Sequence, residues 1–331
     1  MFTLTELQDA ATMVHAHMPP TPAHDWPLLA EALDTPVVVK HENHAPTGAF
    51  KVRGGITFLD WVRRTHPEAE GIVTATRGNH GQSQARAATA LGLKAKIYVP
   101  RGNSTEKNAA MRAYGGEVIE HGDDFDEARV EAMRIAETGA FVPVPPFHTE
   151  LVRGVATYGL ELFTAHPDLD VVYVPIGCGS GICGTIAARD ALGLKTRIVG
   201  VVATQAAGAK LSVEAGHLVE TNAARTFADG MAVRVPVQAA FDIYSHGSER
   251  IETVSETEIA DAIRLYYTAT HNIAEGAGAA ALAAALRDKD RNRGAKVGLI
   301  LSGGNIDMGW FATLLAGGTP TNSVANQPMS I

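Results

Sequence analysis

The chain has 331 residues, a formal net charge of −8 at pH 7 and 46% apolar residues, which describes a globular protein long enough for two domains. No run of about 18 uncharged apolar residues occurs, which excludes a membrane-spanning helix. The acidic balance, with no clustered basic face, argues against a nucleic-acid partner.

The first part of the chain predicts one outer helix followed by a regular alternation of elements. Apolar residues recur every three or four positions over 4–18, and a β-branched run at 37–40 predicts a short strand. From residue 71, strands and helices alternate with short connections, which is typical of a parallel sheet. The strands expected there are 71–75, 95–99, 117–120 and 140–142, and the helices are 82–91, 105–114 and 126–138.

The alternation resumes after Pro145 and Pro146, which mark a candidate domain crossing. Between 203 and 234 no regular pattern is found, Ser255 and Glu258 predict a capping box, and the polar tail from Gly317 is expected to fray. Later strands are expected at 171–174, 198–202 and 297–301, and later helices at 152–164, 182–192, 255–271 and 278–287.

Lys51 is the first candidate for chemistry. It follows Phe50 and precedes the glycine pair 54–55, so an aromatic ring can hold the amine against a flat cofactor while another backbone approaches closely. From this stretch alone, the alternative is a solvated surface lysine.

A second candidate stretch joins the expected strand 71–75 to the next helix. It contains Thr76, Arg77, Gly78, Asn79 and His80, on the side of a parallel sheet where ligands gather. Unpaired amides at a helix start attract anions, so a carboxylate or phosphate is the expected guest. The alternative is a plain helix cap.

A third candidate is the glycine-rich loop after the expected strand 171–174. Its residues are Gly177, Cys178, Gly179, Ser180 and Gly181. The loop can turn its amides around a phosphate at a helix start. It lacks the lysine ending of a nucleoside-triphosphate loop, and no strand-ending acid follows to complete a dinucleotide fingerprint, so a single phosphate monoester is the better guest.

The two cysteines also limit the compartment. Cys178 and Cys183 are too few for a disulfide framework or a four-cysteine zinc site, and they are interpreted as small packing residues. The first six residues lack the basic and apolar segments of a signal peptide. We therefore expect a cytoplasmic protein.

Ser302 is the fourth candidate, because it follows the expected last strand 297–301 directly and precedes two glycines. It is well placed to hydrogen-bond a ligand in a cleft at the strand ends. The alternative is that it caps the following helix.

Together these stretches resemble the serine/threonine dehydratase branch of the fold-type II (tryptophan synthase β-like) pyridoxal-phosphate enzymes, relatives of serine racemase. The resemblance covers roughly residues 15–312. It rests on Phe50-Lys51-x-Arg53-Gly54, Gly78-Asn79-His80, the loop from Gly177, Thr226-Phe227-Ala228-Asp229-Gly230 and Ser302-Gly303-Gly304-Asn305.

The resemblance implies two doubly wound, parallel-type α/β domains with the cofactor in the cleft between them. We expect residues 1–45 and 147–331 to form the large cofactor domain and 46–146 the small domain. A homodimer is also expected from the family.

The resemblance also implies roles for the candidate residues. Lys51 would form the Schiff base, with Phe50 beside it, and Asn79 would hydrogen-bond the pyridine 3-oxygen. The loop Gly177–Gly181 would hold the phosphate, Ser302 would face the pyridine nitrogen, and the turn Thr76–His80 would hold the substrate carboxylate. Glu275 matches a family acid near the ring, without an assigned role.

Two departures from the family carry expectations of their own. Arg77 stands where the racemases carry a catalytic serine, so racemisation is not expected. Its guanidinium either reaches into the cleft, where it favours a charged or aryl β-substituent, or is turned to solvent or tied to a nearby acid. The family's divalent-metal ligands map onto Val202 and Gly208, which have no oxygen side chains. Metal activation is therefore not expected.

The implied reaction is β-elimination from a β-hydroxy-α-amino acid, giving a 2-oxo acid and ammonia, with Lys51 as the base that takes the α-proton. Serine, threonine, 3-hydroxyaspartate and 3-phenylserine all present the required group. Two alternatives stay open: a β-replacement amino-acid synthase of the same superfamily, and a non-catalytic ligand-binding relative.

Overall fold

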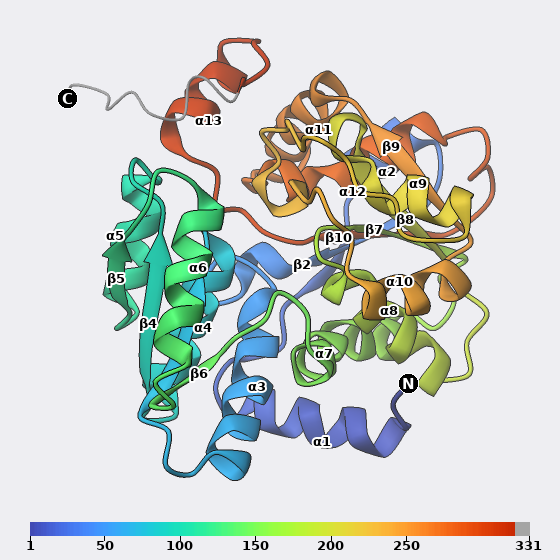
Figure 1. Cartoon of the computed structure of the whole chain (residues 1–331). Coiled ribbons are helices and arrows are strands. Elements are labelled where there is room, and N and C mark those ends of the chain that lie inside the picture. Colours follow the sequence, from blue (N-terminus) through green and yellow to red (C-terminus); the bar gives the residue numbers. More distant parts are fainter. Residues whose placement is uncertain (322–331) are drawn as a thin grey trace.

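The computed structural model describes residues 1–321, in which the strands form two separate sheets (Figure 1). The six-stranded sheet has the order β1–β2–β10–β7–β8–β9, and the four-stranded sheet has the order β5–β4–β3–β6. The larger sheet contains β1 (Ala23–Asp25), β2 (Val37–His41), β7 (Val171–Pro175), β8 (Arg197–Ala203), β9 (Arg250–Val254) and β10 (Val297–Leu301). The smaller contains β3 (Gly71–Ala75), β4 (Lys94–Val99), β5 (Glu117–Glu120) and β6 (Phe141–Pro143).

Helices cover both faces of the six-stranded sheet. Successive strand residues point to opposite faces, so Val172 packs into one core and Tyr173 into the other. The Tyr173 face is covered by α2 (Pro27–Leu33), α11 (Glu256–Thr270), α12 (Gly276–Arg287) and α13 (Met308–Leu315). The Val172 face is covered by α1 (Leu4–His15), α7 (Thr149–Ala165), α8 (Ser180–Ala191) and α10 (Gln238–Gly247).

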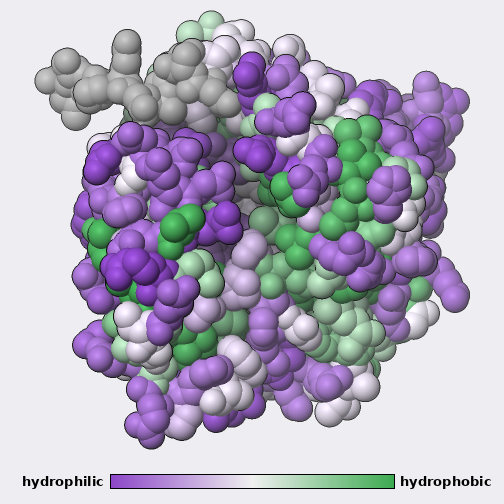
Figure 2. All heavy atoms as spheres, viewed as in Figure 1, coloured by the Kyte–Doolittle hydropathy of each residue, from purple (hydrophilic) through white to green (hydrophobic). Residues whose placement is uncertain are grey.

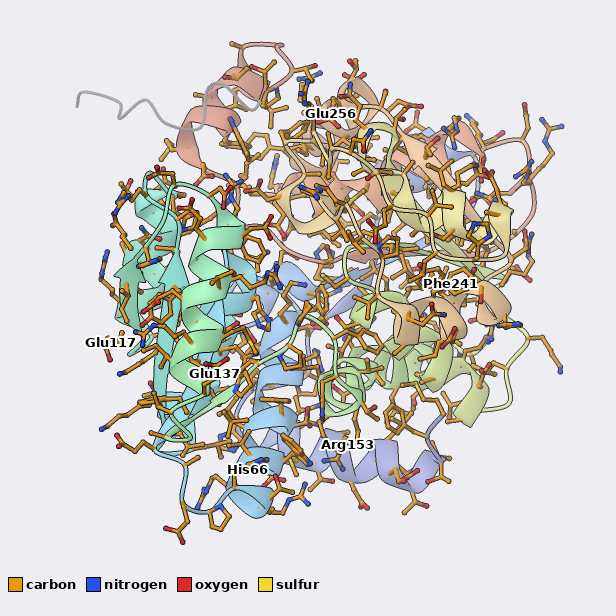
Figure 3. The ribbon with its side chains drawn as sticks, viewed as in Figure 1. His66, Glu117, Glu137, Arg153, Phe241 and Glu256 are labelled. Atoms are coloured by element: carbon orange, nitrogen blue, oxygen red, sulfur yellow. The ribbon has the colours of Figure 1, made fainter. Side chains whose placement is uncertain are left out.

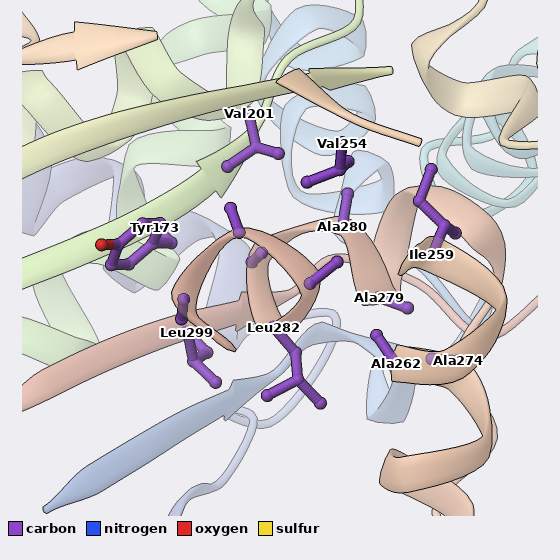
Figure 4. Packing of buried hydrophobic residues seen from close by; sticks show 14 of the residues in the cluster. Tyr173, Val201, Val254, Ile259, Ala262, Ala274, Ala279, Ala280, Leu282 and Leu299 are labelled. Carbon is purple, nitrogen blue, oxygen red and sulfur yellow. The ribbon is translucent and has the colours of Figure 1, made fainter. Parts of the chain in front are cut away.

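Helix α12 packs against strands β7, β8, β9 and β10, and its sequence is almost entirely alanine and glycine. Figure 4 shows Ala279, Ala280 and Leu282 of this helix between the strand residues Tyr173 and Leu299 and helix α11. Residues 276–285 of α12 are all buried. Small side chains let the helix backbone approach the sheet, which fixes the position of residue 275 at its start.

The four-stranded sheet is likewise covered on both faces. Ile72 and Ile97 pack with helices on one face, while Val73 and Tyr98 pack with a helix on the other. The first face carries α3 (Lys51–Thr65), α4 (Asn79–Ala90) and α5 (Thr105–Ala113), and the second carries α6 (Phe125–Ala136). Short connecting elements are α9 (Gly208–Ala215) and the 3-10 turns η1 (Glu42–His44), η2 (Thr204–Ala206) and η3 (Asp229–Met231).

Three strands of this architecture end at the candidate stretches. β3 leads into the turn before α4, β7 leads into the glycine loop before α8, and β10 leads directly into Ser302. Open α/β sheets bind ligands at the carboxyl ends of their strands. The fold therefore brings segments from the two sheets toward one region.

The predicted α/β class is confirmed, with one difference in strand direction: β1 pairs with β2 antiparallel. The capping box of Ser255 and Glu258 is also confirmed. Elements that the sequence patterns did not predict are β1, α2, α9, α10, β9 and α13. Most of these elements are short. Helix α9 lies in the stretch without a regular pattern, and it buries only three of its eight residues, so its sequence shows little periodicity.

The strands of the smaller sheet all lie between residues 71 and 143, which agrees with the expected small domain 46–146; the domain limits themselves stay a prediction. The expected fraying of the tail falls largely on residues 322–331, which lie outside the described residues.

Within residues 1–321 no helix is long and apolar enough to cross a bilayer. Hydrophilic residues make up much of the face seen in Figure 2, with apolar residues in between.

Candidate active site

Lys51 begins helix α3, and its amine lies beside an aromatic ring. Its Nζ lies 4.6 Å from the centre of the Phe50 ring. Within residues 1–321 this nitrogen has no hydrogen bond or ion pair. Burial lowers the pKa of the Lys51 amine, while Cys178 and Glu275 act in the opposite direction. A lysine held in this way is more easily deprotonated, as a nucleophile or base requires.

The segment before Lys51 is tied to the segment after β10. The amide of Phe50 donates to the Ser302 carbonyl at 3.1 Å, and the amide of Gly304 donates to the Gly48 carbonyl at 2.9 Å. Ala49 and Gly303 form an isolated antiparallel bridge. Lys51 and Ser302, far apart in sequence, are therefore held on the wall of the same cavity.

The glycine loop makes an amide-lined turn ahead of helix α8. Gly179 has φ +100°, and it is the helix N-cap without any side-chain hydrogen bond to the first turn. A Cβ at Gly177 would lie 2.1 Å from the Gly230 carbonyl oxygen. The amides at the start of α8 are thus left to an anion, which the helix dipole also favours.

One cavity is lined by all nine residues for which cofactor binding is predicted. Its walls contain Phe50, Lys51, Asn79, Gly177, Cys178, Gly179, Ser180, Gly181 and Ser302, as predicted together from the sequence. They also contain Pro175, Gly230, Met231, Glu275 and Ala277. Of these, Pro175, Met231 and Ala277 carried no chemical signal in the sequence. Gly230 and Glu275 were visible only through the family motif.

Gly230 reaches the cavity because the segment before it is fixed at the start of helix α11. The residue that holds this segment is Glu256, which is labelled in Figure 3. Its carboxylate accepts hydrogen bonds from the Thr226 hydroxyl at 3.1 Å and the Phe227 amide at 2.9 Å. The motif 226–230 therefore has a structural anchor outside the cavity.

Glu275 and Asn79 line the same cavity and are hydrogen-bonded to each other. Asn79 Nδ2 donates to Glu275 Oε1 at 2.7 Å. Burial raises the pKa of the Glu275 carboxyl to about 7, with Lys107 and Asn79 acting against it. Near neutral pH this acid can therefore either hold or release a proton.

The turn after β3 lies beside the cavity rather than on its wall, apart from Asn79. The Thr76 hydroxyl accepts a hydrogen bond from the Gly78 amide at 3.1 Å, and Arg77 is exposed. The buried His80 Nε2 has no hydrogen-bond partner in the described part of the chain, and burial together with Lys51 lowers the pKa of His80 to about 3. The roles predicted for Thr76, Arg77, Gly78 and His80 in holding the substrate carboxylate stay predictions.

A cation that the sequence analysis missed lies next to this turn. Lys107 Nζ pairs with Asp229 at 2.9 Å and with Asp307 at 3.1 Å, and its side chain is 8% exposed. A Cβ at Gly78 would lie 3.2 Å from Lys107 Cδ. No local pattern could have revealed it, because its partners come from distant segments of the chain.

No group of three or more His, Cys, Asp or Glu residues among residues 1–321 could hold a metal ion. The expected insensitivity to chelators, which rests on Val202 and Gly208, stays a prediction.

These features fit a cofactor that carries both a reactive carbonyl and a phosphate. The unpaired Lys51 amine suits the carbonyl, the uncapped start of α8 suits the phosphate, and Ser302 and Asn79 offer hydrogen bonds to a ring between them. The fold and site together define a cofactor-dependent enzyme of the α/β class.

The chain belongs to the family described as pyridoxal-phosphate-dependent enzymes, whose model matches residues 14–303. It is 38% identical to the L-threonine ammonia-lyase of Geobacter sulfurreducens over 84% of this chain and 69% of that protein. It is 28% identical to the L-threo-3-hydroxyaspartate ammonia-lyase of Saccharomyces cerevisiae over 95% of this chain and 97% of that protein. The structure of maize serine racemase superposes with a TM-score of 0.88 at 26% identity, covering 95% and 97% of the two chains.

Proposed function

We propose that the protein catalyses the pyridoxal-phosphate-dependent β-elimination of a β-hydroxy-α-amino acid, giving a 2-oxo acid and ammonia. The observation that carries this is the unpaired amine of Lys51, with its lowered pKa, on the wall of a cavity that ends in an uncapped glycine loop. The names of the relatives, lyases acting on threonine and on 3-hydroxyaspartate, support the same reaction class.

Each residue of the site has a proposed part. Pyridoxal phosphate, when bound, supplies a ring that withdraws electrons from the substrate Cα and so makes its proton acidic. Lys51 accepts that proton, since burial favours its neutral amine. The loop Gly177–Gly181 holds the phosphate, and the neutral hydroxyl of Ser302 meets the ring nitrogen without forcing a positive charge on it.

The turn Thr76–His80 has the part of positioning the substrate carboxylate. In this proposal His80 is uncharged at neutral pH because its pKa is low, so the turn binds through backbone and hydroxyl donors rather than through an imidazolium. Arg77 is exposed beside the cavity, and we assign its guanidinium to the β-substituent of the substrate.

The test is a panel of serine, threonine, 3-hydroxyaspartate and 3-phenylserine, with 2-oxo acid and ammonia measured together. Equal amounts of both products from at least one substrate support the proposal. A product that forms only when a thiol is added, without ammonia, identifies a β-replacement synthase. Purified protein without visible cofactor absorbance, even after incubation with pyridoxal phosphate, identifies a ligand-binding relative.

We also propose that the protein is a cytoplasmic homodimer. Both cysteines are free thiols, which suits a reducing compartment. Light scattering coupled to size-exclusion chromatography measures the mass directly, and a monomeric mass at micromolar concentration would refute the dimer.

A further inference from the structure

Asn305 lies behind Asn79, outside the cavity wall, and its orientation is determined by a main-chain group. Its Nδ2 lies 2.8 Å from the Thr47 carbonyl oxygen and 2.8 Å from Asn79 Oδ1. A main-chain carbonyl can only accept a hydrogen bond, so the Asn305 atom that faces Thr47 must be the nitrogen. The second hydrogen of that nitrogen then goes to Asn79 Oδ1, which lies closer to it than the other acceptor on that side, Gln82 Oε1 at 3.4 Å.

This arrangement in turn determines the orientation of Asn79. Because Asn305 offers it a donor, Asn79 must present its oxygen to Asn305 and its nitrogen to the opposite side. On that side Asn79 Nδ2 donates one hydrogen to Glu275 Oε1 at 2.7 Å. The other hydrogen is available to an acceptor in the cavity, where Asn79 forms part of the wall beside Lys51.

The surrounding backbone is shaped to hold Asn305 in this place. Gly48 has φ +67°, and a Cβ there would lie 2.3 Å from Asn305 Oδ1. At Gly303, a Cβ would lie 2.4 Å from Glu275 Oε1, so a side chain there would collide with the carboxylate. Glycines at both ends thus leave room for the polar chain that runs from Thr47 through Asn305 and Asn79 to Glu275.

We propose that Asn305 is a positioning residue for the reaction: its amide locks Asn79 so that N–H groups, not the amide oxygen, face Glu275 and the cofactor oxygen. The inference rests on the proposed function in so far as it names the cofactor. An N–H that faces an ionised oxygen stabilises it, whereas an amide oxygen in the same place repels it. The lock therefore favours the ionised form of Glu275 and of an acidic oxygen on a bound ring.

Other charges around Glu275 are unaffected by Asn305. Lys107 from α5 and Lys51 from α3 favour the carboxylate, and Asp229 from η3 favours the protonated acid. A change in Asn305 leaves all three in place, so a shift in the titration of Glu275 reports on Asn79.

The experiment compares wild type with Asn305→Ala, and with Asn305→Ser as a second truncation in case the first folds poorly. In cofactor-free protein, infrared difference spectra against Glu275→Gln follow the protonated Glu275 carboxyl as a function of pH. We expect the midpoint to rise by about one pH unit, as the loss of an ordered, charge-assisted hydrogen bond implies. We also expect pyridoxal phosphate to bind about tenfold more weakly in a spectroscopic titration.

Two controls separate positioning from a merely structural role. Asn272→Ala removes another half-buried amide, which bonds Asn43 and His44 away from the cavity, and should leave both measurements unchanged. In an Asn79→Ala background, Asn305→Ala should cause no further shift in the Glu275 midpoint, because the two residues act in series.

The proposal is overturned if neither truncation raises the pH midpoint of Glu275 measurably and neither weakens cofactor binding more than twofold. It is also overturned if the effects of Asn79→Ala and Asn305→Ala on the midpoint add. Neither measurement requires turnover. An enzyme that fails the substrate panel while showing these shifts would refute the proposed reaction and leave the role of Asn305 intact.

Discussion

Lys51 and Arg53 stand two residues apart in the first turn of helix α3, and their environments are opposite. Arg53 is completely buried and bonds Glu42 at 2.8 Å through Nε and Glu161 at 2.6 Å through Nη1. Lys51 has no ion pair among the described residues, although Glu275 shares its cavity.

Their pKa values follow the pairing. Burial alone lowers the pKa of a cation, but Glu42 and Glu161 reverse this for Arg53, whose pKa is raised. Nothing of comparable strength reverses it for Lys51, whose pKa is lowered. Burial would likewise raise the pKa of Glu161, yet Arg53 and Lys40 lower it to about 2. A buried charge that is fully paired serves the fold, and one left unpaired beside a cavity is available for chemistry.

The largest expected effect comes from removing the unpaired cation. Lys51→Ala should abolish the visible absorbance of the bound cofactor. It should also lower the turnover rate to near zero, by about 10²–10⁴-fold or more if the amine is the base. Product formation is measured on the substrate panel, with Lys94→Ala at an exposed ion pair as the control. Ammonia release at the wild-type rate by the Lys51 variant would contradict the assignment.

Removing the paired cation should change stability instead. Arg53→Met removes from the buried Glu42 and Glu161 the cation that they share through several hydrogen bonds, and leaves Lys40 as their remaining buried cation. We expect the free energy of unfolding to fall by about 3–5 kcal/mol. The control is Arg64→Met, which breaks the exposed pair with Asp60 and should cost about 0.5 kcal/mol or less. Urea unfolding measures both, and equal losses in the two variants would remove the distinction between the cations.

Glu275 provides the acidic counterpart of Lys51. Its folded pKa, about 7, lies above the ordinary value of 4.5, so it stabilises the fold below pH 4.5 relative to higher pH, and this contribution is lost as pH rises through 7. Compared with Glu275→Gln, wild type should lose up to about 3 kcal/mol between pH 4 and pH 8. Urea unfolding of cofactor-free protein across this range measures the free energy of unfolding at each pH. If this free energy depends on pH in the same way in both proteins, the Glu275 carboxyl is exposed to solvent rather than buried.

The smallest expected effect concerns a cation that is exposed. If the Arg77 guanidinium contacts the β-substituent, Arg77→Ala should lower kcat/KM on 3-hydroxyaspartate or 3-phenylserine only. The decrease should correspond to a loss of about 2 kcal/mol in transition-state stabilisation. Arg101→Ala, at another exposed arginine, is the matched control. The same kinetics for both variants on every substrate would mean that Arg77 remains in solvent during the reaction.

The sequence by itself determined the class of fold and the segments that meet at the cavity. Buried strands of Val and Ile alternating with helices specify parallel crossover units, and glycine clusters at strand ends mark the loops, because both signals are local. Lys51, the loop Gly177–Gly181 and Ser302 were found in this way, and the cavity contains all of them. Their individual roles remain to be tested by the experiments above.

Only the tertiary structure decided which charges are paired. Arg53 looks like Lys51 in the sequence, and its partner Glu161 lies 108 residues away. The links from Asn305 to Asn79 and from Asn79 to Glu275 span 226 and 196 residues. Hydrogen bonds and ion pairs act over a few ångströms, and the distances between such groups are set by how the two sheets and their helices pack, which no local pattern encodes.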